Sequence, residues 1–430
     1  MDPNKSDVID DIPAKILKQF ASELANPIAD VINASLVQGK WPNIFKLEIV
    51  TPVPKEFPPE NVEQLRNISG LVNLDKVSEK IIAKLIISDM REKLDPSQFA
   101  NQKGWSIQHY LMKMLYRIPK ALNNNSKGES CAVLATMVDW KQAFPRQCPK
   151  LGVESFVRNG VRPSLIPVLA DYFQGRSMKV KWHGELSSAR ELNGGGPQGS
   201  TFGIWEYLSQ SNDNCESVGE SERFKFVDDL TFLEIIYLLN VGIATYNVKA
   251  HVPSDVPIHN QIIMPENLET PKHLEKINNW TKGMKMQLNG KKTKSIIFNF
   301  SKKNQFTSNL SVNIVKLEIV NEVKLLGTYI TSYLKWNKNT KVIVKKAYAR
   351  MQLLNKSANF TNNRYDLRSI YLTFIRSILE QSVVVWHSSQ EKKRPGKSTE
   401  VEEYKKSSIP YMVNLLNEEI ENNKNNMKEE

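Results

Sequence analysis

A pair of adjacent aspartates, Asp228 and Asp229 in the segment FKFVDDLTF, constrains the fold of this sequence more than any other feature. Apolar residues alternate on both sides of the pair, which predicts a β-hairpin with the acids at its turn. Far upstream, the apolar run CAVLATMVD ends in Asp139 and is typical of a buried strand with a functional tip. If these strands lie side by side, the three carboxylates form one cluster. An Asp139 on a different face would exclude that cluster.

Two hypotheses account for these acids. Aspartate is a common turn residue, so an exposed Asp-Asp turn needs no chemical role. Clustered carboxylates are, however, tolerated when divalent cations neutralise them. Phosphoryl transfer by two metal ions requires such a set: one ion lowers the pKa of the attacking hydroxyl and the other stabilises the leaving oxygen.

Helices and further strands are predicted around this hairpin, so the fold class is α+β with an antiparallel sheet packed on helices. Apolar residues recur at helical spacing in residues 12–36, 74–94, 108–122, 340–354 and 365–385. Extended segments are predicted in WPNIFKLEIVTPVPK, in 291–300 and in 314–330. A Pro- and Asn-rich stretch near 249–272 predicts a loop insertion, and the charged residues 391–430 predict a poorly ordered tail.

The charge of the chain favours an anionic partner. Its 430 residues have a formal net charge of +12, and nucleic acid is the commonest partner of such a basic protein. A proteome that is merely rich in lysine is the alternative. Lysines in KWNKNTKVIVKKAYARMQ would contact phosphates regardless of base sequence, or would form a solvated helix face.

Several other classes of protein are disfavoured. Cys131, Cys148 and Cys215 stand far apart, which supports neither a disulfide framework nor a zinc site. The acidic N-terminus lacks the apolar core of a signal peptide. The apolar segment 230–248 carries Glu234 and Asn240 and fits a buried element better than a membrane span. We expect an intracellular protein, nuclear or cytoplasmic, without a membrane partner.

Five motifs occur in an order that resembles a known family: VDWKQAF, GGGPQGS, FVDDL, LNGKKTK and LLGTYI. Together they resemble the palm motifs of the reverse transcriptases of non-LTR, jockey-like retrotransposons. The resemblance extends over roughly 12–389 and implies a right-hand polymerase. It places an N-terminal extension and fingers in 1–98, the palm in 99–330 and a partial thumb in 331–390. Implied partners are an RNA or DNA template with primer and deoxynucleoside triphosphates, and the implied cofactor is two Mg²⁺ ions, with Mn²⁺ possible.

The resemblance also implies roles for single residues. Asp139 and Asp228 resemble the metal ligands, the Trp140 carbonyl would add a main-chain oxygen, and Asp229 completes the acidic cluster. Lys292 resembles the lysine that protonates pyrophosphate. The residues that would bind the nucleotide are Lys55, Arg66, Phe144, Pro197, Gln198 and Gly199. Phe144 would exclude a ribose 2′-hydroxyl, and Leu326–Gly327 resembles the primer grip. From the residues alone, a solvated Lys292 and an ordinary turn at Leu326–Gly327 are equally good explanations.

Two departures from the family pattern leave alternatives open. Pro145 follows Phe144 where the family has an aspartate, so we expect a changed local backbone with activity retained. The family's basic continuation is absent after 389 and no endonuclease domain precedes the palm, which suggests a fragment, an excised domain or a degenerating copy. The main alternative is therefore an inactive or domesticated copy that binds nucleic acid only. An RNA-copying RNA polymerase is disfavoured by the bulk of Phe144.

Overall fold

The structure is a computed structural model, and it describes residues 12–55, 58–123, 130–238, 261–263, 268–299, 305–307, 311–312, 315–316, 318–357 and 363–386. The predicted tail at 391–430 and most of the predicted insertion near 249–272 lie outside these residues. In the described part of the chain, no helix combines the length and apolar character needed to cross a membrane.

A five-stranded central sheet carries the two acidic motifs, with strand order β14-β10-β3-β8-β7. Its central strand β3 (Ser130–Val138) pairs antiparallel with β8 (Asp229–Leu238) and with β10 (Lys294–Phe298). At one edge β7 (Arg223–Phe226) is antiparallel to β8, and at the other β14 (Glu318–Ile319) is parallel to β10. The predicted α+β class is confirmed, with one parallel edge in a sheet predicted to be antiparallel throughout.

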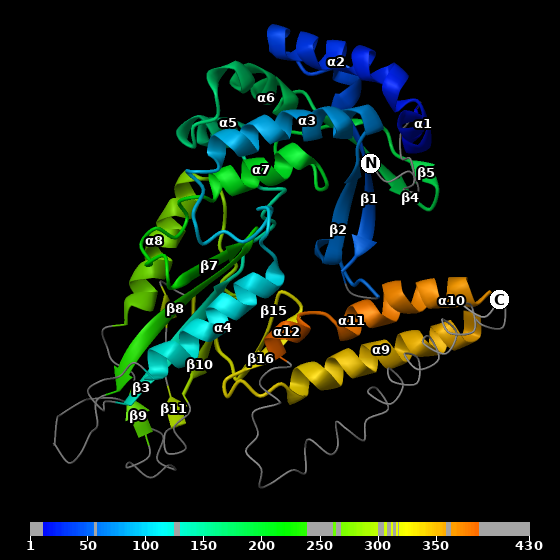
Figure 1. Cartoon of the computed structure of the whole chain (residues 1–430). Helices are drawn as coiled ribbons and strands as arrows, with labels where there is room; N and C mark the ends of the chain where they lie inside the picture. The colour runs from blue at the N-terminus through cyan, green and yellow to red at the C-terminus, as the bar shows by residue number, and fades with distance from the viewer. Residues whose placement is uncertain are drawn as a thin grey trace.

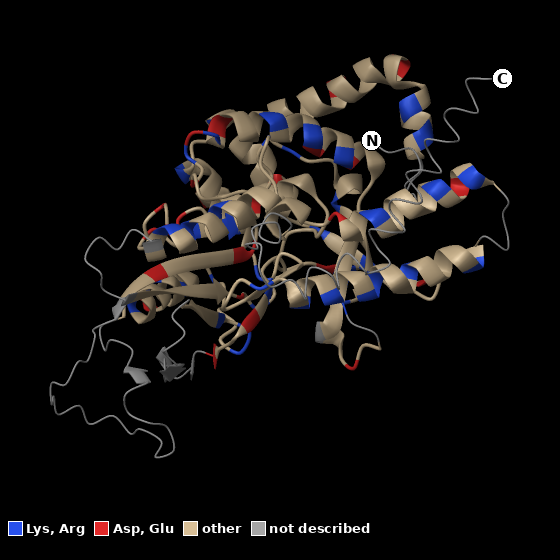
Figure 2. Cartoon of the chain, turned by 60° about the horizontal axis from the view of Figure 1, so that its bottom comes forward, with Lys and Arg blue, Asp and Glu red and all other residues tan. Residues whose placement is uncertain are grey.

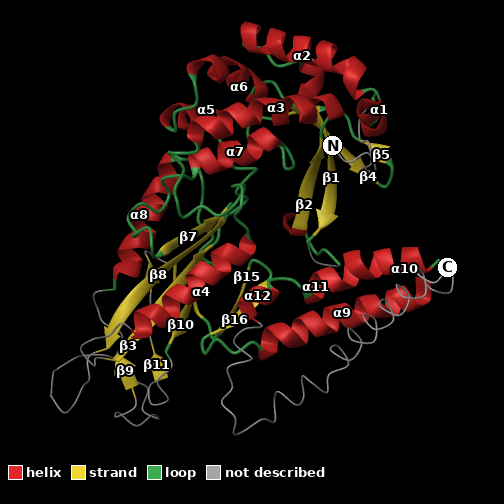
Figure 3. Cartoon of the chain, in the orientation of Figure 1, coloured by secondary structure: helices red, strands yellow, loops and turns green. Residues whose placement is uncertain are grey.

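The central sheet is covered on both faces, which explains the unbroken apolar run in β3. Ala132 and Leu134 join the core that includes α8 (Glu269–Gly283). Val133 and Ala135 alternate with them and join the core on α4 (Ile107–Asn123). Figures 1 and 3 show α4 lying along this sheet.

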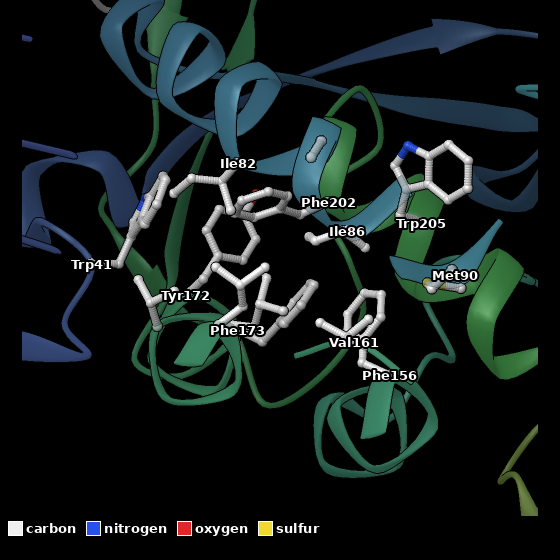
Figure 4. Packing of buried hydrophobic residues seen from close by; sticks show 14 of the residues in the cluster. Trp41, Ile82, Ile86, Met90, Phe156, Val161, Tyr172, Phe173, Phe202 and Trp205 are labelled. Atoms are coloured by element: carbon white, nitrogen blue, oxygen red, sulfur yellow. The ribbon is translucent and has the colours of Figure 1, made fainter. Parts of the chain in front are cut away.

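A layer of helices packs around its own aromatic core beside one end of the sheet (Figure 1). Trp41, Tyr172 and Phe202 meet there, with ring centroids 4.9–5.5 Å apart (Figure 4). The helices that contribute to this core are α2 (Ala21–Gln38), α3 (Asn73–Met90), α5 (Pro149–Arg158), α6 (Ile166–Phe173) and α7 (Thr201–Gln210), and α1 (Ala14–Gln19) contacts α2. Short 3-10 turns occupy Asn43–Lys46, Val62–Gln64 and Pro163–Leu165. The helix predicted at 12–36 is therefore two helices that meet at Phe20.

A second sheet adjoins this layer, with strand order β2-β1-β4-β5 and β6 paired to β4. Strands β1 (Leu47–Pro54) and β2 (Leu65–Gly70) form an antiparallel hairpin, while β4 (Ser177–Trp182) runs parallel to β1. The remaining strands are β5 (Glu185–Leu186) and β6 (Arg190–Glu191).

The C-terminal part differs from the sequence predictions in two places. The strand predicted at 314–330 is divided into β13 (Val315–Lys316), β14 and a hairpin of β15 (Glu322–Leu325) and β16 (Thr328–Thr331), because Leu326 and Gly327 form a turn with positive φ. The helix predicted at 365–385 is divided into α10 (Arg364–Ile370), a π-helical segment (Tyr371–Arg376), α11 (Ser377–Leu379) and α12 (Val383–Trp386). The long helix α9 (Asn337–Ser357) covers the helix predicted at 340–354. Short strands β9 (Gln261–Ile263), β11 (Gln305–Thr307) and β12 (Ser311–Val312) complete the described elements.

Candidate active site

The three predicted acids meet at one end of the central sheet. Asp139 follows the last residue of β3, whose pairing with β8 ends at Val138 opposite Leu230. Asp229 is the first residue of β8, and Asp228 stands in the two-residue turn that links β7 to β8. The adjacent-strand arrangement predicted from the two apolar runs is therefore present.

The turn between β7 and β8 is held in an unusual backbone conformation. Val227 has a φ of 55°, a left-handed value that a β-branched residue seldom adopts. Its N–H donates to the side-chain oxygen of Gln98, 3.2 Å away. Strand β7 is anchored by Lys225, whose buried ammonium lies 2.7 Å from the carboxylate of Asp95. Such strain persists only where the surroundings hold the backbone in place.

The carboxyl groups of the cluster affect one another electrostatically. Burial, the charge of Asp228 and that of Asp139 raise the pKa of Asp229 to about 7. The pKa of Asp228 is also raised, first by desolvation from the surrounding protein and then by the charge of Asp139. The residue itself remains exposed at the tip of the turn. Burial raises the pKa of Asp139, and the hydrogen bond from Asn289 opposes the rise. The fold therefore brings together carboxyl groups that disfavour one another's ionisation.

Asn289 supports Asp139, and the sequence analysis did not single it out. Its side-chain amide donates to Oδ2 of Asp139 at 2.8 Å, and its backbone N–H donates to the Asp139 carbonyl at 2.8 Å. The backbone N–H of Asp139 donates to the hydroxyl of Thr293 at 3.2 Å. Both partners come from the LNGKKTK motif, in which the sequence had implied a role for Lys292 alone.

The donor set suits a hard divalent cation, since Mg²⁺ and Mn²⁺ prefer carboxylate oxygens. A cation would also relieve the repulsion that, after burial, raises the pKa values of Asp228 and Asp229. Within the described residues, however, no three Asp, Glu, His or Cys side chains already stand in a metal-ligand arrangement. The acids would have to move closer together around an ion. The roles of Asp139, Asp228 and Trp140 as metal ligands thus stay predictions.

Trp140 and Lys292 both lie beside Asp139. Hydrogen bonds from Asn289 to Asp139 and from Lys141 to Gln287 flank the bridge between Trp140 and Leu288. In this pattern the Trp140 carbonyl points away from Leu288, which leaves it available to another partner. The charge of Lys292 lowers the pKa of Asp139.

Two basic residues of the β1–β2 hairpin affect the acids electrostatically. Arg66 lies on β2 opposite Val53, and Lys55 follows β1, with its backbone N–H donating to the Gln64 carbonyl at 2.8 Å. The charge of Lys55 lowers the pKa of Asp139, and that of Arg66 lowers the pKa of Asp228. Both basic residues are exposed, so this hairpin presents positive charge toward the acidic cluster.

The PQG loop, residues Pro197 to Gly199, precedes α7 in the chain and contacts strand β2 of the same hairpin. The Gln198 carbonyl accepts from the N–H of Ser69 on β2 at 2.9 Å. Gly199 has a φ of 121°, and a Cβ there would lie 3.2 Å from the Ser69 carbonyl oxygen. Only glycine fits this backbone without strain. The loop is therefore fixed against β2 at Ser69.

Glu79 and Phe144 tie α7 to the rest of the site. The carboxylate of Glu79 accepts from the Thr201 N–H at 2.6 Å and also from the hydroxyl of Tyr172. The Phe144 ring stacks on that of Tyr207, with centroids 5.1 Å apart and planes at 27°. Burial raises the pKa of Tyr207, and the charges of Asp228 and Asp229 raise it further, so the ring on which Phe144 stacks lies within electrostatic range of the acids.

Leu326 and Gly327 belong to a different hairpin. They form the turn between β15 and β16, with φ of 47° and 84°. A Cβ on Gly327 would lie 2.3 Å from the Gln381 amide nitrogen, so this turn packs against the segment after α11. Their primer-grip role stays a prediction. A cavity of about 540 Å³ between α1, α2 and α3 has none of the predicted site residues in its lining.

Comparison with curated proteins agrees with the motif resemblance. The chain is 23% identical over 393 residues to the probable RNA-directed DNA polymerase from transposon BS of Drosophila melanogaster, covering 89% of this chain and 40% of that protein. It is 28% identical over 234 residues to the corresponding X-element protein, 53% of this chain and 25% of that one. The polymerase from mobile element jockey is 22% identical over 295 residues, 68% of this chain and 29% of that protein. The predicted resemblance to jockey-like elements is confirmed.

The chain spans less than half the length of these relatives. No family model matches it. Among solved structures, apo telomerase from Candida tropicalis superposes with a TM-score of 0.45 at 11% identity, covering 90% of this chain and 65% of that one. A form truncated from its C-terminal domain gives a TM-score of 0.43 at 12% identity, covering 68% and 54%. The residue bounds of fingers, palm and thumb stay predictions.

Proposed function

We propose that this chain is the polymerase core of a retroelement reverse transcriptase, which extends a primer with deoxynucleotides on an RNA or DNA template. The observation that carries the proposal is the meeting of Asp139 with the Asp228–Asp229 turn on adjacent strands. An Asp-Asp turn without a chemical role would not require a third aspartate on the neighbouring strand. The curated relatives, named as RNA-directed DNA polymerases, support the same reaction.

The acids would hold the metal ions that act on the primer and the nucleotide. Two Mg²⁺ or Mn²⁺ ions bound by Asp139, Asp228 and the Trp140 carbonyl would supply Lewis acidity to the attacking 3′-hydroxyl and the leaving oxygen. Asn289 holds the Asp139 carboxylate in one orientation through its hydrogen bond. Asp229 adds negative charge that favours cation binding at the cluster. The primer oxygen attacks the α-phosphate, and the bond from that phosphate to pyrophosphate breaks.

The surrounding residues would bind and select the nucleotide. Lys55 and Arg66 carry positive charge on the hairpin that faces the acids, which suits a triphosphate. Lys292 would donate a proton to the leaving pyrophosphate. The PQG loop would support the template base and the nucleotide, and the Phe144 ring would exclude a 2′-hydroxyl.

Primer extension tests this proposal. The purified chain, an RNA template with a DNA primer, deoxynucleotides and Mg²⁺ or Mn²⁺ should yield extended primer. Asp228→Asn should lower extension by at least about a hundredfold while duplex affinity changes little, because the substitution removes a metal ligand and no phosphate contact. Asp30→Asn, exposed on α2, makes the same change of charge away from the acidic cluster and is the matched control.

Two results would contradict the polymerase function. Wild-type protein that binds duplex but extends nothing with either metal would favour the alternative of a binding protein. Equal losses of binding and extension in Asp228→Asn would instead identify Asp228 as a structural residue.

A further inference from the structure

The stack between Phe144 and Tyr207 links the predicted sugar-selecting residue to α7. Tyr207 is fully buried, while Phe144 packs at the border of the core that lines the central sheet. The near-parallel rings, 5.1 Å apart, define the plane in which the Phe144 side chain lies. An aliphatic residue in place of Tyr207 could not define that plane.

The backbone of Phe144 is tied to the same helix through Gln147. In the amide orientation that satisfies both neighbours, Gln147 donates to the Phe144 carbonyl at 3.3 Å and accepts from the Tyr207 N–H at 3.0 Å. The Phe144 carbonyl also accepts from the N–H of Gly196, 3.3 Å away. Gln147 is almost fully buried, so water does not compete for these bonds.

The loop after Phe144 has little room to shift. Gly195 has a φ of 84°, and a Cβ there would lie 3.0 Å from the carbonyl oxygen of Pro145. Its N–H donates to the Gln147 carbonyl at 2.9 Å. Backbone contacts therefore hold the Phe144 main chain, and its side-chain torsion is left to the ring beneath it.

The burial of Tyr207 is not explained by a hydrogen bond of its hydroxyl group. In the described part of the chain this hydroxyl has no hydrogen-bond partner. A buried hydroxyl without a partner costs free energy, so packing of the ring must justify its position. Substitutions can therefore distinguish the contribution of the Tyr207 ring from that of its hydroxyl.

We propose that Tyr207 is a positioning residue for sugar selection, which sets the orientation of Phe144 by ring stacking. This inference rests on the proposed polymerase function and goes beyond the assignment of Phe144 alone. Its consequence is that discrimination between deoxyribonucleotides and ribonucleotides depends on a residue that does not touch the sugar.

The test compares the ratio of kcat/KM for a deoxynucleotide to kcat/KM for the matching ribonucleotide in primer extension. Tyr207→Leu should lower this ratio roughly three- to tenfold, as expected for loss of an aromatic pair. Tyr207→Phe, which keeps the ring, should preserve it. Tyr207→Met, closer in length and flexible, replaces the leucine variant if that variant does not fold. Thermal unfolding of each variant separates a change of selectivity from a loss of folded protein.

A double-mutant cycle shows whether Tyr207 acts through Phe144. In a Phe144→Val background, which should itself admit ribonucleotides, Tyr207→Leu should have no further effect on the ratio. An unchanged ratio in Tyr207→Leu, or an equal fall in Tyr207→Phe, would overturn the inference while the polymerase function stands. A wild-type protein that extends no primer would overturn both.

Discussion

At the residue scale, Asp139 illustrates why a site needs more than its acids. A carboxylate at a strand end can rotate, and only partners from elsewhere fix its orientation. Asn289 bonds the carboxylate and Thr293 bonds the backbone N–H of Asp139, both from a segment about 150 residues away. The strand and the acid could be predicted from local pattern, because both depend on neighbouring residues. The partner could not, because no periodicity relates Asn289 to Asp139.

Loss of the Asn289 amide should weaken the site without unfolding it. Asn289→Ala removes the 2.8 Å bond to Asp139, and outer partners of metal ligands are typically worth 10- to 100-fold in affinity or activity. We expect extension to fall by about that factor and the Mg²⁺ concentration for half-maximal extension to rise. Asn279→Ala, exposed on α8, is the control. Normal metal dependence in Asn289→Ala would show that Asn289 does not support the metal site.

Glu206 is a buried carboxyl group that the proposed reaction does not use. It lies on α7 against Gly152 and Gly196, and within the described structure neither of its side-chain oxygens has a hydrogen-bond partner. Burial raises its pKa from 4.5 to about 8. The folded state therefore holds this proton more tightly than the unfolded state. The resulting stabilisation is complete below pH 4.5 and is lost as the pH rises through about 8.

Glu206→Gln should make stability less dependent on pH. The amide does not titrate, so the unfolding temperature of the variant relative to wild type should rise by a few degrees between pH 5 and pH 9. The exposed Glu154→Gln on α5 makes the same change of charge and should show no such trend. A constant difference across this range would mean that Glu206 ionises normally in the folded protein.

At the element scale, two hairpin turns carry predicted functional residues and differ in what holds them. The β7–β8 turn keeps Val227 at positive φ through Gln98 and the buried Lys225–Asp95 pair. The β15–β16 turn uses a glycine and packs on Gln381. The first hairpin was predictable because apolar alternation surrounds its acids. The second lies in the extended segment predicted at 314–330, where a turn at Leu326–Gly327 was one of two explanations of that pair, since LLGTYI has apolar residues on both sides of its glycine.

The second turn should not tolerate a side chain at Gly327. Gly327→Ala places a Cβ at a φ of 84° and within 2.3 Å of the Gln381 amide. The left-handed conformation alone costs about 1–2 kcal/mol for a residue with a Cβ. A lower urea midpoint should report this loss. Gly283→Ala, at the end of α8 with nothing within 4 Å of its Cβ, should instead be neutral or stabilising. Equal effects of the two substitutions would refute the argument from the positive φ of Gly327.

At the scale of the whole molecule, the sequence predicted the acidic strands but only part of the helical layer beside them. The helices predicted at 12–36 and 74–94 are present in the structure. Motifs in chain order implied a sheet with acids at one end, and the pairing of β3 with β8 agrees. Helices α5, α6 and α7 were not predicted, and their contacts depend on the buried set around Tyr172 and Phe202. Glu79, which joins that set to α7, resembles a surface helix residue in sequence and is buried only in the assembled fold.

Lys and Arg residues occur along many of the helices (Figure 2). Helix α9 carries Lys341 and Lys345 one turn apart, and both side chains are exposed. Helix α8 carries Lys272 and Lys276 at the same spacing, also exposed. The two pairs are matched in charge and helical spacing. From the sequence we expect the lysines of α9, and not those of α8, to contact the phosphates of the template–primer duplex.

Salt dependence distinguishes these pairs. Each phosphate contact releases counterions, so log affinity should fall linearly with log salt, by about 0.9 for every contact with a B-form duplex. Replacement of Lys341 and Lys345 by Gln should reduce that slope by roughly one to two and weaken binding to all duplex sequences alike. The same replacement at Lys272 and Lys276 should leave the slope unchanged. Fluorescence anisotropy between 50 and 300 mM salt measures both. A flat response in wild type would mean that phosphate contacts contribute little to binding. Equal losses from both pairs would mean that net charge rather than α9 determines binding.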